Sequence, residues 1–115
     1  MCLATSLAVL TAATVMPRQV AAQTALPSPW ISQDIGGPAA EGSASFDQGV
    51  FTISGSGQDI WGTADQFHFM YQAVSGDVDI IARIDSMSPG DPWSKTGVMI
   101  RGALSAGAPH ALAIV

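Results

Sequence analysis

The side chains best suited to binding chemistry are aromatic and polar residues between positions 59 and 101 of the 115-residue chain. Sugar sites combine an aromatic platform, whose apolar face stacks on a sugar ring, with polar groups that hydrogen-bond the hydroxyls. Trp61 and Trp93 are the candidate platforms. The candidate polar partners are Asp65, His68, Lys95 and Arg101. This set indicates a polysaccharide or another glycan as the ligand.

Each of these residues also has a plainer interpretation. Trp61 lies between predicted strands, which favours a place in the core, whereas Trp93 follows a proline in a loop and fits either role equally well. We expect His68 to be exposed or to line a groove. Lys95 and Arg101 should lie on strand faces turned to solvent or to a groove, where exposed cross-strand ion pairs are worth less than about 1 kcal/mol.

Catalysis is not expected from this chain. Glycoside hydrolysis usually needs two carboxyl groups, about 5–5.5 Å apart for retention and further apart for inversion. The chain has one glutamate, Glu41, and no Glu-x-Asp-x-x-Glu arrangement. Asp79 and Asp85 would lie about 20 Å apart on one extended strand. The open alternative is a hydrolase whose catalytic residues lie beyond Val115.

Acidic residues near turns raise the question of a metal. Calcium takes six to eight oxygen ligands from carboxylates and carbonyls. Asp59, Asp77 and Asp79 are the candidate ligands for a structural calcium ion, although no EF-hand spacing is present. Aspartate also suits tight turns without any metal, and that is the favoured interpretation of the same residues.

The charge balance bears on the class of partner. The chain has 4 basic and 9 acidic side chains and a formal net charge of -5. Nucleic-acid-binding proteins usually carry a basic patch, so a nucleic-acid partner is not expected. Hydrophobic residues make up 48% of the chain, which is enough for a folded core and argues against disorder.

The first residues have the pattern of a secretory leader. Residues 3–16 form an apolar run, and Pro17 and the small residues Val20, Ala21 and Ala22 follow it. A run of about 7–15 apolar residues before such a cleavage site is typical of a signal peptide, and it is too short to span a bilayer. We interpret residues 1–22 as the signal peptide, 23–29 as a short linker and 30–115 as the folded domain.

This interpretation makes the protein secreted or periplasmic, with no membrane contact after cleavage. The single cysteine, Cys2, leaves with the leader, so the mature chain would form no internal disulfide. Arg18 leaves as well, and three basic and nine acidic residues then give a net charge of -6.

The domain itself has the texture of an antiparallel β protein. Short apolar stretches alternate with period two and are separated by Gly, Asp, Ser and Pro, whereas no ten-residue stretch keeps a helical period. Strands are predicted at residues 43–47, 50–54, 58–61, 66–73, 78–87 and 96–101. The stretch at 78–87 has the longest and clearest alternation. Many short strands with regular turns indicate a sandwich.

The last residues read as an unfinished strand. Residues 110–115 are mostly apolar and resemble the opening of a seventh strand. Because a domain seldom ends on an open sheet edge, we expect the chain to be the N-terminal part of a longer domain in a larger protein. The alternative is a short sandwich that this strand closes.

Three sequence blocks carry a resemblance to a known family. They are GSGQDIWGTADQFHF at residues 55–69, SGD at 75–77 followed by IARI at 81–84, and WSKTGVMIR at 93–101. In this order and spacing they resemble secreted bacterial concanavalin A-like domains of unknown function, also labelled regulation-of-enolase-1-like. The resemblance covers about residues 30–115.

The resemblance implies an antiparallel two-sheet jelly-roll sandwich of the lectin and glucanase type, truncated at its C-terminus. It also implies an accessory module of extracellular, often sugar-handling, proteins, in which a structural calcium ion is common. It carries no catalytic residue onto this chain. We therefore expect a secreted, non-catalytic carbohydrate-binding module. A structural or adhesion sandwich without a sugar site is the competing class.

Overall fold

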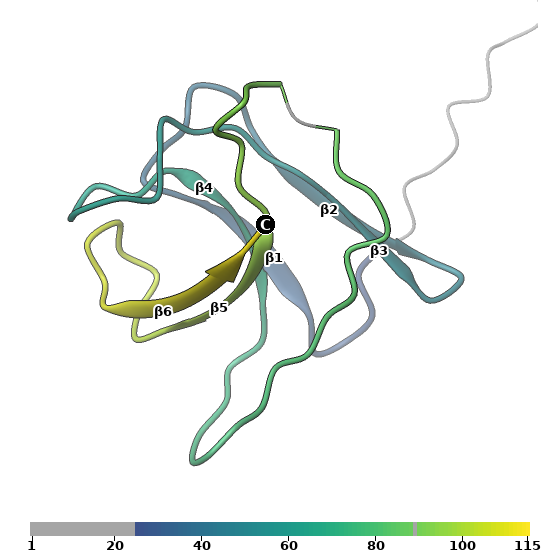
Figure 1. Ribbon diagram of the computed structural model, residues 1–115. Coiled ribbons are helices and arrows are strands. Elements are labelled where there is room, and N and C mark those ends of the chain that lie inside the picture. The colour runs from purple at the N-terminus through teal and green to yellow at the C-terminus, as the bar shows by residue number, and fades with distance from the viewer. Residues whose placement is uncertain (1–24, 89) are drawn as a thin grey trace, which may run out of the picture.

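The computed structural model describes residues 25–88 and 90–115 (Figure 1), so the predicted signal peptide and the start of the linker lie outside the described residues. The regular secondary structure of the described residues is entirely β. The six strands are β1 (Ile31–Ile35), β2 (Ser43–Asp47), β3 (Val50–Ser54), β4 (Phe67–Tyr71), β5 (Gly97–Arg101) and β6 (His110–Ile114). The expected all-β class is confirmed.

The strands form three antiparallel ladders of two strands each: β2 with β3, β5 with β6, and β1 with β4. The β2–β3 hairpin turns at Gln48 and Gly49, whose φ angles of 45° and 87° suit the tight turn that right-twisted strands require. The β1–β4 ladder is not local, because it places Ile35 opposite Phe67 across the whole β2–β3 hairpin. Figure 1 shows the β5–β6 hairpin in front of the β1–β4 ladder.

Most of the predicted strands are confirmed, and two are wrong. The predictions at 43–47 and 50–54 have the observed bounds, and those at 66–73, 96–101 and 110–115 contain β4, β5 and β6. Residues 58–61 instead belong to a loop, and residues 78–87 pair with no other described segment. β1 was not predicted, because Ile31 and Ile35 are its only apolar residues and polar side chains separate them.

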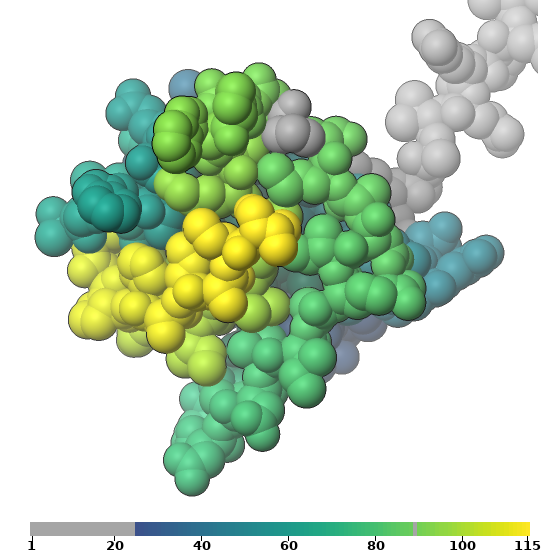
Figure 2. Space-filling model, viewed as in Figure 1, coloured from purple at the N-terminus to yellow at the C-terminus, as the bar shows by residue number. Residues whose placement is uncertain are grey.

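Within residues 78–87, the side chains of residues 80–84 nevertheless point alternately toward β5–β6 and toward solvent, as the sequence pattern predicts. Ile80, Ala82 and Ile84 line two shallow hollows of about 200 and 290 Å³ against β5 and β6, whereas Ile81 is 93% exposed. In Figure 2 the yellow surface of β6 lies beside the green surface of this segment. A strand needs a partner's backbone groups as well as an apolar face, and the hollows separate this segment from β5 and β6.

Few side chains are fully enclosed. The buried apolar residues are Ile35, Met99 and Ala108, and Asp65 is buried with them. Three aromatic rings on one face of β4 extend this core, with centroids 5.6 Å apart for Phe67 and Phe69 and 5.2 Å apart for Phe69 and Tyr71. The row shows that Phe67, Phe69 and Tyr71 share one face of β4, as the period of two predicts.

The other face of β4 carries His68, which packs against two glycines. Its side chain is 5% exposed, so the expectation of an exposed or groove-lining histidine is wrong. A β-carbon at Gly42 would overlap the imidazole ring, and one at Gly55 would lie 2.7 Å from His68 Cβ. His68 is buried because these glycines leave room for it beneath the β2–β3 hairpin.

Replacing Gly42 by alanine should therefore destabilise the fold. The added methyl group meets the imidazole, and overpacking of this kind costs about 1–3 kcal/mol. We expect Gly42→Ala to lower the melting temperature by about 10 °C in a thermal scan. Gly102→Ala is the matched control, because its β-carbon would lie at an ordinary 3.6 Å from Pro109 O. Equal melting temperatures for the two variants would contradict the packing.

Candidate functional site

Two tryptophans stand out from the surface. Trp61 lies in the loop between β3 and β4 and is 81% exposed, and Trp93 lies in the loop before β5 and is 83% exposed. The prediction that Trp61 fills the core is therefore wrong. The reason is local: Trp61 is followed by Gly62 at a φ of 72° in a turn, so no strand holds its side chain inward. Both aromatic platforms are accessible to a ligand.

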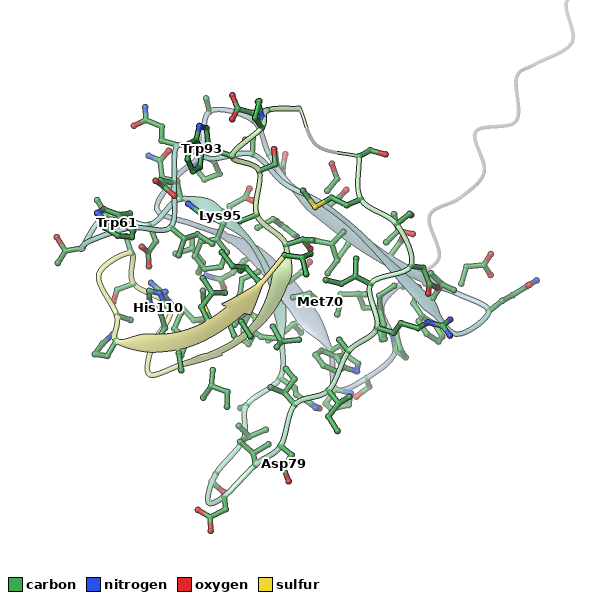
Figure 3. The ribbon with its side chains drawn as sticks, in the orientation of Figure 1. Trp61, Met70, Asp79, Trp93, Lys95 and His110 are labelled. Atoms are coloured by element: carbon green, nitrogen blue, oxygen red, sulfur yellow. The ribbon has the colours of Figure 1, made fainter. Side chains whose placement is uncertain are left out.

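An ion pair joins the two loops that carry these tryptophans. Lys95 Nζ donates to Asp59 Oδ1, and the two residues are separated by 36 positions in the chain. Trp61 is two residues from Asp59 and Trp93 is two residues from Lys95, so the Cα atom of each tryptophan is within about 7 Å of the Cα atom of a paired residue. Figure 3 shows Trp61, Lys95 and Trp93 at the same end of the molecule.

Hydrogen bonds fix Asp59 in this position. Its backbone carbonyl accepts the amide of Gln66 at 2.8 Å, and its Oδ1 accepts the amide of Ile60 at 2.7 Å. The Lys95 ammonium group, helped by the Ile60 amide, holds the pKa of the Asp59 carboxyl below its ordinary value. Asp59 is therefore an anion at neutral pH and keeps its contact with Lys95.

A tight polar turn presents Trp93. The carboxylate of Asp91 accepts the amide of Trp93 at 2.8 Å, and its carbonyl accepts the amide of Ser94 at 3.0 Å. The Ser94 hydroxyl accepts the Asp91 amide at 3.2 Å. This reciprocal arrangement is typical of Asp and Ser in turns. The Asp-Pro-Trp-Ser sequence contains the signal for it, but the hydrogen bonds themselves were not predicted. The turn fixes the backbone that holds the exposed indole.

Asp65 and Arg101 form a buried ion pair instead of a ligand site. Arg101 Nη1 donates to Asp65 Oδ2 at 2.8 Å, and each side chain is 1% exposed. The guanidinium group lies 5.4 Å from the centroid of Phe67. The expectation that Arg101 faces solvent or a groove is wrong, because the charge of Asp65 and the ring of Phe67 draw it inward. Neither residue is accessible to a glycan.

The same guanidinium group fastens the turn between β5 and β6. Arg101 Nη2 donates to the carbonyls of Ser105 and Ala106 at 2.6 and 3.0 Å. The amide of Asp65 donates to Ala106 O at 3.2 Å, and His110 Nδ1 lies 3.6 Å from Asp65 Oδ2. This network ties the start of β4 to the β5–β6 hairpin, so its role is structural.

His68 also has a structural partner that the sequence did not reveal. Its Nδ1 lies 2.7 Å from Asp34 Oδ1, and the Asp34 carboxylate accepts the Gly42 amide at 3.1 Å. The hydrogen bond from His68, followed by that from Gly42, holds the pKa of the Asp34 carboxyl below its ordinary value of 3.8. The partner could not be inferred because β1 itself was not predicted.

The expected calcium ligands do not come together. Asp59 is committed to Lys95, and Figure 3 places Asp79 at the opposite end of the molecule from Trp61 and Lys95. Residues 25–88 and 90–115 contain no group of three or more His, Cys, Asp or Glu side chains that could hold a metal ion. The described residues therefore do not fit a calcium site built on Asp59, Asp77 and Asp79.

Comparison with known protein families, curated proteins and solved structures finds no match to this chain. Within the part of the chain that the structure describes, no helix is long and apolar enough to cross a membrane.

Removing Arg101 should destabilise the protein far more than removing an exposed arginine. Arg101→Met leaves the buried Asp65 carboxylate uncompensated, and breaking such a pair costs about 3–5 kcal/mol. Arg83→Met is the control, because Arg83 meets Asp85 at 2.6 Å with its own side chain 87% exposed, and such pairs contribute about 0–1 kcal/mol. Denaturant unfolding measures both. Similar losses in the two variants would contradict a structural role for the buried pair.

Asp34 should also contribute to acid unfolding. Its folded-state pKa is lowered, so the stability it contributes is present above its ordinary pKa of 3.8 and is lost as the pH falls through the folded value. We expect Asp34→Asn to have a lower melting temperature at neutral pH and a shallower decline below about pH 4. Melting curves across this range test it, with Asp77→Asn as the exposed control. An unchanged acid decline in Asp34→Asn would contradict the assignment.

Proposed function

We propose that this protein is a secreted, non-catalytic β-sandwich module that binds carbohydrate at the Trp61–Trp93 site, defined as Trp61, Trp93, Asp59 and Lys95. The observation that supports it is the exposure of both indoles, 81% and 83%, on two loops that an ion pair joins. Exposed aromatic faces beside hydrogen-bonding groups suit the apolar face and the hydroxyls of a sugar ring.

Burial divides the six predicted ligand residues into two groups. Trp61, Trp93 and Lys95 remain at the surface, and Asp59 joins them as the partner of Lys95. The residues withdrawn from solvent are Asp65, His68 and Arg101. The proposed site is therefore smaller than the predicted one and lies at one end of the molecule, formed by loops.

The finer fold assignment is part of the proposal. Short antiparallel strands, and a ladder that pairs β1 with the distant β4, are compatible with a concanavalin A-like jelly roll. The three sequence blocks at 55–69, 75–84 and 93–101 support the same assignment. Secretion or export to the periplasm rests on the apolar run at residues 3–16 and the small residues at 20–22.

A structural or adhesion role is the second candidate, and one observation favours it. The hollows between residues 80–84 and the β5–β6 hairpin are lined by apolar side chains, among them Val98 and Ala113. An apolar surface of this kind suits contact with another polypeptide better than contact with a sugar. Binding that survives loss of both tryptophans would favour this second role.

Loss of either tryptophan should weaken glycan binding without unfolding the protein. Both side chains lie outside the core, so Trp61→Ala and Trp93→Ala should change the melting temperature by no more than about 2 °C. Each should weaken glycan binding about tenfold or more, because stacking on the aromatic ring is lost. Ile81→Ala, which removes a 93% exposed apolar side chain elsewhere, is the control. Affinity electrophoresis in gels containing polysaccharide, followed by calorimetry, measures the effect; wild-type affinity in both tryptophan variants would refute the site.

A further inference from the structure

We infer that the ligand of the Trp61–Trp93 site is an uncharged glycan chain that lies across both tryptophans, and not an acidic glycan; this inference rests on the proposed function. It follows from the charges around the site and from the way the two loops are joined.

The cationic groups of the described residues are already occupied. The three Lys and Arg side chains each meet a carboxylate: Lys95 meets Asp59, Arg83 meets Asp85 and Arg101 meets Asp65. A uronate or sulfate group would have to separate one of these pairs or bind without a counter-charge. Arg101 is in addition 1% exposed, so only Lys95 is both close to the tryptophans and partly accessible.

The described residues carry more carboxylates than cations, and one unpaired carboxylate lies beside Trp93. The described residues hold nine acidic side chains and three Lys or Arg side chains, so six carboxylates exceed the available cations. One of the surplus carboxylates, Asp91, lies two residues from Trp93 and accepts its amide. Like charges repel an incoming anion, and this repulsion is a specificity device against acidic chains.

The ion pair between the loops supplies polar contacts that a neutral sugar can use. The Asp59 side chain is 50% exposed and that of Lys95 is 24% exposed, so the pair is reachable from solvent. A carboxylate accepts hydrogen bonds from hydroxyls, and an ammonium group donates to them. Both contacts form without breaking the pair and without any charge on the ligand.

The placement of the two platforms on separate loops favours a chain over a single sugar. Trp61 follows Asp59 by two residues in the sequence, and Trp93 precedes Lys95 by two residues. Because the indoles stand on separate loops, two residues of an oligosaccharide can each stack on a different indole. The second contact is then intramolecular and strengthens binding by about a hundredfold or more over a monosaccharide.

The test is a polysaccharide array that carries neutral and acidic glycans, probed with the full chain at low and at moderate salt. We expect signal on neutral glycans only, lost in the Trp61→Ala, Trp93→Ala double variant. Trp-dependent signal on acidic glycans would overturn the inference and leave the proposed function intact. No signal on any glycan would overturn both.

Calorimetry on a neutral glycan identified by the array then tests the shared platform. We expect affinity to rise by about a hundredfold from the monosaccharide to the hexasaccharide. Lys95→Met, which unties the loops but leaves both indoles, should weaken monosaccharide binding through the loss of one hydrogen-bond donor and should in addition reduce the gain with chain length; Arg83→Met should change neither. Affinity that does not depend on length in the wild type, or an undiminished gain in Lys95→Met, would refute a site shared by the two tryptophans.

Discussion

The buried contact between Arg101 and Asp65 is the interaction on which the arrangement of the chain depends. The described residues form three separate ladders, and Ile35, Met99 and Ala108 are their buried apolar residues. Burying two charges costs several kcal/mol each unless hydrogen bonds satisfy them. Arg101 donates to Asp65 Oδ2 and to two carbonyls of the β5–β6 turn, whereas Arg101 Nε and Asp65 Oδ1 are buried without a hydrogen-bond partner among the described residues. The two buried charges are therefore satisfied in part, and the bonds they do make hold the β5–β6 hairpin to β4.

The loop that carries Trp61 is anchored by two ion pairs, one buried and one exposed. The loop between β3 and β4 is held at its C-terminal end by the buried pair at Asp65 and near its middle by the exposed pair between Asp59 and Lys95. Trp61 lies between these two anchors. The buried pair determines the stability of the frame, whereas the exposed pair contributes little stability and sets how the two tryptophan loops lie relative to each other. A substitution in the buried pair should therefore change the stability of the fold, whereas a substitution in the exposed pair should change the arrangement of the two tryptophan loops.

The sequence predicted what is local and missed what depends on distant partners. The strand at β3 was found because polar and apolar residues alternate over residues 50–54, and the aromatic face of β4 followed from its period of two. Residues 78–87 have the clearest alternation, yet no ladder forms there, because alternation reports an apolar face and says nothing about a partner strand. Arg101 and His68 were expected at the surface because their partners, Asp65 and Asp34, lie 36 and 34 positions away and no spacing rule links them.

Exposure of a tryptophan is not by itself a sign of binding, because many apolar side chains in soluble proteins face water. Ile81 is more exposed than either indole, but its segment belongs to no ladder with another described segment, so nothing local selects its position. Trp93 differs, because three hydrogen bonds between Asp91, Trp93 and Ser94 fix its turn. Burying an aromatic side chain would contribute about 2–3 kcal/mol, and this turn forgoes that gain. A fixed turn that keeps a large apolar ring in water therefore supports the proposed Trp61–Trp93 site.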